Sequence, residues 1–313
     1  MLRILPLLPL ALAAALLMGA AARAAGDPSP VVAVTIKPLH SLVAGVMAGI
    51  GKPDLVVPGT ALPRDYAPTA ADIQRLAKAR LVFWIGPMME RNFARPLSAI
   101  AGATEVVSVA EGPGMVLRPT RSGGVWALED DVPVGTGDTS ATDGHLWLDP
   151  QNARVIVALA ATRLGAADPA HAARYTSNAA TLHARLDALD NTLRQKLGAV
   201  ANWRFLVYRD DYQYLEQRYR LSAAGAILGA AGQPPGPLRL GALRHQIQLS
   251  RARCILGEPD SPEAVIDAVA DGLNLRTGSL DPEGIALKPG PDLYFDLMTG
   301  LADSLRKCLL GRG

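Results

Sequence analysis

The chain has 313 residues, of which 49% are apolar and 19% are charged, and its formal net charge is +2. This length and apolar content suffice for about two domains, each with its own buried core. A net charge this small argues against nucleic acid or an anionic membrane surface as the partner.

The first residues are typical of an exported bacterial protein. A basic start at Arg3 precedes a run of Leu, Ala and Pro from Ile4 to Ala22, and Ala22-Arg23-Ala24 places small residues where signal peptidase cuts. We expect residues 1–24 to be a cleaved signal peptide, which makes the mature chain neutral and periplasmic. A membrane anchor is the alternative, but the run is short and contains two prolines, and no stop-transfer segment follows it.

Strand and helix patterns alternate in the first third of the chain. Buried strands are predicted at 31–36, 55–57, 81–85 and 106–109. One helix is predicted from His40 or Ser41, and another over 69–78, where Thr69 is a suitable N-cap and Asp72 follows three residues later. Such alternation predicts a parallel sheet with helices on both faces.

The middle of the chain departs from this rhythm. Residues 112–143 are rich in Gly, Pro, Asp and Thr and are too long for an ordinary connection, so we predict a mobile surface loop. Helices are predicted at about 151–164 and 168–198. The second repeats leucine at helical spacing, and at about 30 residues it would span about 45 Å.

The strand–helix alternation returns after residue 199. Strands are predicted at 205–208 and 254–257, helices at 212–219 and 262–272, then a short strand and a closing amphipathic helix at 292–308. The predicted fold is α/β, with two lobes that each contain a mostly parallel sheet flanked by helices. We place the N-terminal lobe at 25–165, a rigid connecting helix at 166–198 and the C-terminal lobe at 199–313. Because ligands bind such sheets at the carboxyl ends of the strands, we expect the site in the cleft between the lobes.

The two cysteines, Cys254 and Cys308, lie in the last third of the chain. In an oxidising compartment such a pair predicts one disulfide. It would close a loop of about 55 residues and contribute about 4 kcal/mol in the chain-entropy model. Neither cysteine belongs to a C-x-x-C motif, so we expect a structural bridge.

Recognisable catalytic motifs are missing from the sequence. It has no G-x-S-x-G, no Walker A loop, no H-E-x-x-H and no G-x-G-x-x-G after a strand, so we expect no enzyme. His171, His183 and His245 have polar helical neighbours typical of a solvated surface. His40 and His145 fall at predicted strand–loop junctions that face the cleft, and these two are the candidate functional histidines.

Three stretches of the chain resemble a known family. Residues 35–43 (TIKPLHSLV), 144–150 (GHLWLDP) and 277–284 (TGSLDPEG) are similar, in order, to the zinc-binding periplasmic component of bacterial zinc-uptake ABC transporters. This is the ZnuA/TroA-like family of cluster A-I solute-binding proteins. The resemblance runs from about Val31 to Cys308, and the Cys254–Cys308 pair resembles the disulfide of the family's C-terminal lobe.

The resemblance implies a monomeric receptor that holds a metal ion between two lobes. Such a receptor delivers its cargo to a membrane permease driven by a cytoplasmic ATPase. The family's usual ligands are three histidines with a carboxylate or water, a donor set suited to Zn²⁺. His145 matches the histidine of the family's H-x-W-x-D-P stretch, and Asp281 matches the aspartate of its L-D-P-x-G stretch.

Two positions depart from the family pattern. Arg64, in Leu62–Tyr66, and Arg209, in Val207–Tyr212, both stand where the family has a histidine. The long loop has no histidine run and carries only scattered acids: Glu129, Asp130, Asp131, Asp138 and Asp143. Arginine has no lone pair and stays cationic, so neither arginine can bind a metal ion.

The two arginines leave three hypotheses open. In the first, a displaced metal site uses His145, Asp281 and His40 with a further carboxylate; the supporting candidates are Asp210, Glu258 and Asp260. In the second, the cleft binds no free zinc, and Arg64 and Arg209 pair with Asp281 and Glu258. In the third, the arginines bind an anion such as a metal chelate. We expect the family-level function, capture and delivery of a metal ion of the Zn²⁺ type, at a site whose metal binding is weakened, altered or lost.

Overall fold

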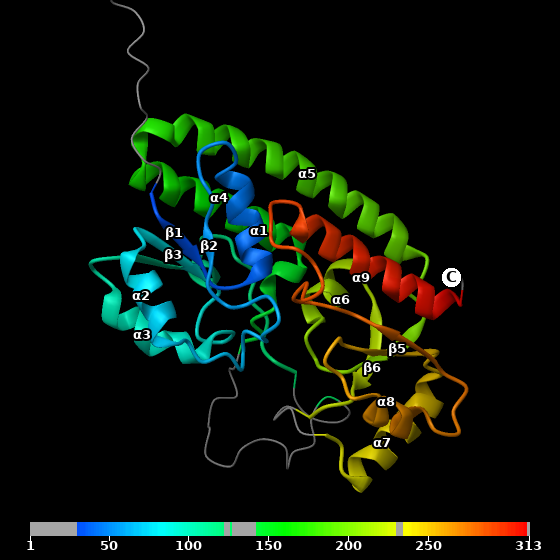
Figure 1. Ribbon diagram of the computed structural model, residues 1–313. Coiled ribbons are helices and arrows are strands. Elements are labelled where there is room, and N and C mark those ends of the chain that lie inside the picture. Colours follow the sequence, from blue (N-terminus) through cyan, green and yellow to red (C-terminus); the bar gives the residue numbers. More distant parts are fainter. Residues whose placement is uncertain (1–29, 122–125, 127–141, 230–233, 312–313) are drawn as a thin grey trace, which may run out of the picture.

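The computed structural model describes residues 30–121, 126, 142–229 and 234–311 (Figure 1). The predicted signal peptide and most of the predicted loop at 112–143 lie outside the described residues. Within the described ranges, no helix combines the length and the apolar character that crossing a membrane requires.

A four-stranded parallel sheet forms the first lobe, with strand order β2-β1-β3-β4. The strands are β1 (Val32–Val34), β2 (Asp54–Leu55), β3 (Leu81–Trp84) and β4 (Glu105–Ser108). The helices between them are α1 (Lys37–Val46), α2 (Ala70–Lys78) and α3 (Ala94–Ile100). Helix α1 begins before His40, because Pro38 fits the first turn of a helix. Thr69 and Asp72 form the reciprocal capping box of α2.

The second lobe repeats this arrangement with strand order β6-β5-β7-β8. Its strands are β5 (Arg204–Val207), β6 (Ser222–Ala226), β7 (Cys254–Gly257) and β8 (Arg276–Ser279), and its helices are α6 (Gln213–Tyr219), α7 (Pro237–Ser250) and α8 (Glu263–Ala270). Strand β6 was not predicted, because its Ser-Ala-Ala-Gly-Ala sequence has low strand propensity. Pairing with β5 at the edge of the sheet makes it a strand.

Three long helices pack together along one side of the two sheets: α4 (Pro150–Ala167), α5 (Ala172–Gly198) and α9 (Leu293–Leu310). Figure 1 shows α5 running over both halves of the molecule, with α1 and α4 beneath one half and α9 beneath the other. This confirms the predicted long connecting helix, except that a 3-10 turn at Pro169–His171 precedes its first residue. A Cβ on Gly45 of α1 would come within 2.8 Å of Leu182 on α5, so glycine allows their close packing.

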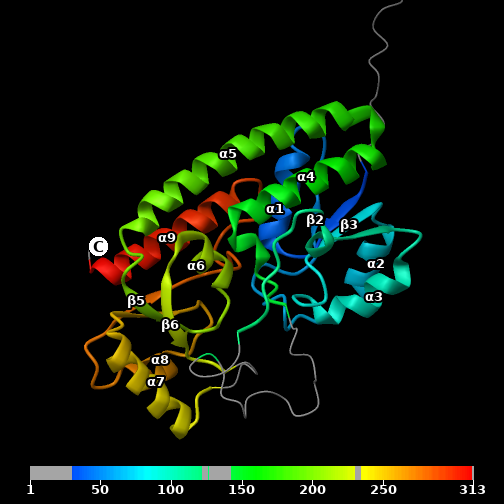
Figure 2. The same cartoon turned by 180° about the vertical axis from the view of Figure 1, so that it is seen from behind.

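Alternate residues of the central strands face two different cores. Leu81 and Phe83 of β3 face a core that is shared with α4, α5 and α9 and is continuous through both lobes. Val82 and Trp84 face a separate core on the other side of the sheet. The second lobe likewise has a separate core, which α7 and α8 cover. In Figure 2, α2 with α3 and α7 with α8 lie on the side of the molecule opposite α5.

The predicted disulfide is confirmed. Cys254 of β7 and Cys308 of α9 are bonded, with their Cα atoms 5.9 Å apart. The bridge ties the shared helical layer to the second sheet.

Candidate functional site

The residues that follow β5 carry three consecutive charges, and each side chain has different partners. Arg209 donates to Glu258 and, over 2.7 and 3.1 Å, to Asp260. Both acceptors follow β7, so these pairs lie within the second lobe. The Tyr212 hydroxyl also donates to Glu258, over 3.2 Å. Arg209 thus neutralises a buried carboxylate of its own lobe.

Asp210 pairs with an arginine of the first lobe. Nε of Arg121 donates to both carboxylate oxygens of Asp210 over 2.9 Å, and its terminal nitrogens donate to Glu216 over 2.8 and 2.9 Å. The guanidinium also lies over the ring of Trp126, 3.5 Å from its centroid. Arg121, a residue of the predicted loop at 112–143, therefore joins this part of the loop to the second lobe.

Asp211 also contacts a residue of the first lobe. Nη2 of Arg64 donates to Oδ2 of Asp211 over 2.5 Å and lies 3.1 Å from Nε2 of His145. The same nitrogen of His145 is 3.5 Å from Oδ2 of Asp211, so the three atoms form a closed triangle. Burial alone would lower the pKa of Arg64, but Asp211, Glu258 and Glu283 raise it well above its usual range.

A second carboxylate orients the imidazole ring of His145. Oδ1 of Asp143 accepts from the His145 backbone N–H over 2.9 Å and lies 2.8 Å from the ring nitrogen Nδ1. Such a contact directs Nε2 toward the cleft. Burial lowers the pKa of His145, but Asp211 and Asp143 outweigh it and raise the pKa to about 9. Asp211 therefore lies between the guanidinium of Arg64 and the imidazole of His145.

Glu283 completes this group of side chains. Its Oε1 lies 3.9 Å from Nε2 of His145, and its Oε2 is buried with no hydrogen-bond partner among the described residues. Only 6% of its side chain is exposed. Burial raises the pKa of Glu283 to about 7. We call Arg64, Asp143, His145, Asp211 and Glu283 the interlobe cluster.

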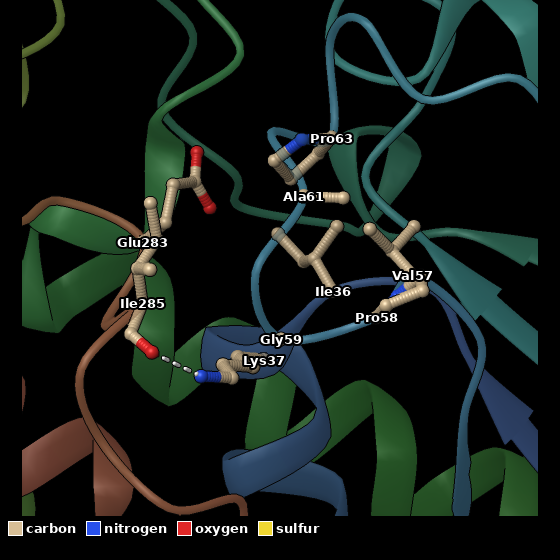
Figure 3. Close-up of a pocket in the computed structure, with 9 residues that line it drawn as sticks. All are labelled: Ile36, Lys37, Val57, Pro58, Gly59, Ala61, Pro63, Glu283 and Ile285. Atoms are coloured by element: carbon tan, nitrogen blue, oxygen red, sulfur yellow. Dashed lines mark hydrogen bonds between the residues drawn. The ribbon is translucent and has the colours of Figure 1, made fainter. Parts of the chain in front are cut away.

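The loop that carries Glu283 is held by contacts with the first lobe. Nζ of Lys37 donates to the carbonyls of Gly284, Ile285 and Leu287 over 2.8–2.9 Å. Nε1 of Trp147 donates to the Pro282 carbonyl over 3.0 Å. Figure 3 shows the narrow pocket beside this loop, with Glu283 and Ile285 on one side and Pro63, Ala61 and Val57 on the other. The backbone around Glu283 is therefore fixed.

Of the three ligands predicted from the sequence, the structure places His145 in the interlobe cluster and the other two elsewhere. His40 lies inside α1, where its Nε2 is 3.0 Å from the Pro53 carbonyl. Asp281 accepts from the backbone N–H groups of Ile285 and Ala286 over 2.9 and 3.1 Å, which shapes its own loop. Both side chains are therefore engaged away from His145.

The supporting residues are also redistributed. Asp210 contacts Arg121, and Glu258 contacts Arg209, as one of the hypotheses expected for Glu258. Arg64 pairs with Asp211 instead of Asp281. Sequence reasoning missed Asp211 and Glu283 as cleft residues. Both follow predicted strands within stretches already singled out, so their position after the strand ends was the available signal.

The cluster offers donors for a cation, but an arginine nitrogen stands among them. In the described part of the chain, no three histidine, cysteine or carboxylate side chains are arranged to hold a metal ion as they stand. His145, Asp211 and Glu283 nevertheless present one imidazole and two carboxylates, with Nε2 3.5 and 3.9 Å from the two acids. Ligand atoms about 2 Å from a tetrahedral metal lie about 3.3–3.5 Å apart. A small rearrangement would therefore suit a divalent cation.

The comparisons with known proteins agree on one family. The family model described as "Zinc-uptake complex component A periplasmic" matches residues 32–308. The "High-affinity zinc uptake system protein ZnuA" of Brucella abortus (strain 2308) is 35% identical over 304 residues, which cover 89% of this chain and 91% of that protein.

Two solved structures share the fold. The periplasmic zinc-binding protein TroA from Treponema pallidum matches with a TM-score of 0.73 at 20% identity, covering 90% of this chain and 99% of that chain. The SBP FpvC from Pseudomonas aeruginosa, in complex with Mn²⁺, matches with a TM-score of 0.75 at 21% identity, covering 91% and 100%.

Proposed function

The chain belongs to the ZnuA family of periplasmic zinc-uptake components, and on that premise we propose that it captures a divalent metal ion, Zn²⁺ in the first place, between its two lobes. In this proposal it is exported through residues 1–24 and delivers its cargo to the permease of an ABC transporter. It is a binding protein and not an enzyme.

The observation that carries the proposal is the chemistry of the interlobe cluster. Three carboxylates, from Asp143, Asp211 and Glu283, surround the imidazole of His145, and the one guanidinium among them is that of Arg64. A metal ion would displace the protons from His145 and Glu283, and the three carboxylates with a neutral imidazole then favour a cation as cargo. The cluster also joins residues of both lobes, as a site that reports its occupancy to a permease requires.

The residues present fit a metal ion only at a changed position. Arg64 and Arg209 cannot be ligands, and Asp281 is bonded to backbone N–H groups. His145, Asp211 and Glu283 supply nitrogen and oxygen donors that suit Zn²⁺, and also harder cations such as Mn²⁺. The proposed cargo class is therefore a divalent transition metal ion.

A competition titration tests the proposal. Metal-stripped mature chain is titrated with Zn²⁺ by calorimetry in the presence of a competing chelator. We expect one Zn²⁺ per chain and loss of binding in His145→Ala. His171→Ala is the matched control, because His171 contacts Asp168 in the turn before α5. No binding at micromolar Zn²⁺ would contradict the proposal.

The arginine pairs supply one specific observation for a second candidate function. Arg64 joins the two lobes through Asp211, so the chain could act as a receptor that is closed without free metal, as one of the hypotheses held. This candidate predicts no zinc binding in the same titration. An anion as cargo is less well supported, because Arg64 and Arg209 are both engaged by carboxylates.

Export and delivery have their own test. Cell fractionation should find the mature chain in the periplasm, and deletion of residues 1–24 should retain it in the cytoplasm. A strain without the gene should grow more slowly than its parent in chelator-treated medium. The wild-type gene should restore growth and the His145→Ala gene should not.

A further inference from the structure

We propose that the guanidinium of Arg64 is a tethered cation that occupies the metal position and competes with metal for a site formed by His145, Asp211 and Glu283. The inference rests on the proposed function and adds both a changed ligand set and a built-in competitor. Metal enters when Arg64 turns out toward solvent.

The geometry of Arg64 is the first argument. Its Nη2 contacts the two atoms that a metal ion would join, Oδ2 of Asp211 at 2.5 Å and Nε2 of His145 at 3.1 Å. A guanidinium nitrogen and a divalent cation satisfy a carboxylate in the same way, by positive charge. Both cannot occupy the space between Asp211 and His145.

The state of Glu283 is a second and independent argument. Its carboxylate is 94% buried, and its Oε2 has no hydrogen-bond partner among the described residues. A buried carboxylate oxygen without a partner costs free energy. Oε1 lies 3.9 Å from Nε2 of His145, so a metal ion bound to His145 would supply the missing partner.

Differences in exposure show which side chain can move. Arg64 is 34% exposed at its side chain, whereas His145, Asp211 and Glu283 are each 6–7% exposed. Arg64 lies in the turn at 62–66, and its side chain contacts Asp211 and His145. The proposed ligands are held in place: Asp143 contacts the ring of His145, and Lys37 and Trp147 hold the loop of Glu283. Exchange therefore requires rotation of one long side chain around a fixed set of donors.

Charge and donor type define the cargo. One imidazole and two carboxylates form a harder site than three histidines, and such a set accepts Zn²⁺ and Mn²⁺. Replacement of a guanidinium by a divalent ion also raises the positive charge in a cluster that contains three carboxylates. Competition by Arg64 weakens the binding of every metal cation. Removal of Arg64 should therefore strengthen the binding of both Zn²⁺ and Mn²⁺.

The decisive variant is Arg64→Gln, titrated with Zn²⁺ and separately with Mn²⁺ against a chelator. We expect the Zn²⁺ dissociation constant to fall at least tenfold relative to the wild-type chain. Arg75→Gln is the matched control, because Arg75 makes an ion pair of the same 2.5 Å length with Asp72 on the outer helix α2. Its dissociation constant should stay within about twofold of wild type.

Thermal melting gives a readout that does not depend on the titration. Without metal, Arg64→Gln should melt below the wild-type chain, because Asp211 loses its arginine. Saturating Zn²⁺ should raise the melting temperature more in Arg64→Gln than in the wild-type chain.

The proposed ligands are tested by single substitutions in the chain that keeps Arg64. This test therefore does not depend on whether Arg64→Gln folds. Glu283→Gln should weaken Zn²⁺ binding at least tenfold. Asp281→Asn should change it less than threefold, because its carbonyl oxygen can still accept from the loop. The reverse pattern, with Asp281 essential and Glu283 dispensable, would overturn the proposed site.

The remaining outcomes separate the inference from the proposed function. If the wild-type chain binds Zn²⁺ and Arg64→Gln binds it no more tightly, the competitor role is wrong and metal capture stands. If neither protein retains Zn²⁺ or Mn²⁺ at micromolar concentration, metal capture itself is wrong and the inference falls with it.

Discussion

Arg64 and Arg209 contact their carboxylates in different ways, although both stand where the family resemblance places a histidine. Arg64 reaches from the first lobe to Asp211 of the second and shares that carboxylate with His145. Arg209 stays within the second lobe, where it pairs with Glu258 and Asp260. The same substitution thus has two consequences. One arginine competes for the candidate ligands, and the other neutralises a buried glutamate beside them.

Among the substitutions at these two arginine pairs, Asp211→Asn should lower the free energy of unfolding the most. It removes the buried carboxylate that the guanidinium of Arg64 and the imidazole of His145 share. We expect a loss of about 3–5 kcal/mol in the free energy of unfolding, measured by urea denaturation at pH 7. A loss below about 1 kcal/mol would show that Asp211 does not hold the Arg64 and His145 side chains together.

An aspartate outside the cleft provides the reference for that value. Asp190 of α5 accepts from Arg218 and Tyr219 of α6 and from Arg194, and its side chain is 8% exposed. Burial raises the pKa of Asp190, but these donors outweigh it and lower the pKa below the usual value. We expect Asp190→Asn to lose about 2–3 kcal/mol at pH 7.

The pH dependence of the Asp190 variant follows from the direction of that shift. A folded-state pKa below the unfolded value means that the folded chain binds fewer protons there, so the stabilisation is complete above the unfolded pKa of about 4. It is lost as the pH falls through the folded pKa. Urea midpoints of wild type and Asp190→Asn should therefore converge below pH 4, and a constant difference would contradict the assignment.

Arg209→Gln and Arg64→Gln, compared directly, sharpen the difference between the two arginines. Arg209→Gln should cost about 2 kcal/mol, because Glu258 is 3% exposed and loses its arginine. Arg64→Gln should cost about 1 kcal/mol, because Arg64 is one-third exposed and Asp211 retains His145. Equal losses, measured by urea denaturation without metal, would indicate that both pairs are equally buried in solution.

The smallest effect is expected at the rim of the Arg209 pair. Asp260→Asn should change the free energy of unfolding by about 0.5 kcal/mol or less, since Asp260 is 35% exposed and Glu258 remains with Arg209. The same urea series measures it. A loss as large as that of Arg209→Gln would show that Arg209 stabilises the fold mainly through Asp260 and not through Glu258.

Much of the fold could be predicted from local pattern. Alternating apolar residues such as Leu81 to Trp84 must face two cores, and leucines at helical spacing on α5 must bury one stripe. Strand β6 escaped prediction because Ser, Ala and Gly give no such signal. Its conformation comes from pairing with β5.

The site was predicted less completely, for a physical reason. Resemblance placed His145, Arg64 and Arg209 near the cleft, and one of the three hypotheses paired the arginines with acids. Which acid each arginine meets depends on side-chain direction across two lobes. Asp281 turns to the backbone N–H groups of its own loop, and Glu283, two residues later, points to His145.

The sequence by itself determined the α/β class, the two sheets, the connecting helix, the Cys254–Cys308 disulfide and the family. These follow from periodicity and from motifs a few residues long, which act over short distances along the chain. Only the tertiary structure decided that Arg64 lies between Asp211 and His145 while Arg209 does not. Arg64 is separated from His145 by 81 positions in the sequence and from Asp211 by 147. These contacts form only because the two lobes pack together and bury carboxylates that have no other partner.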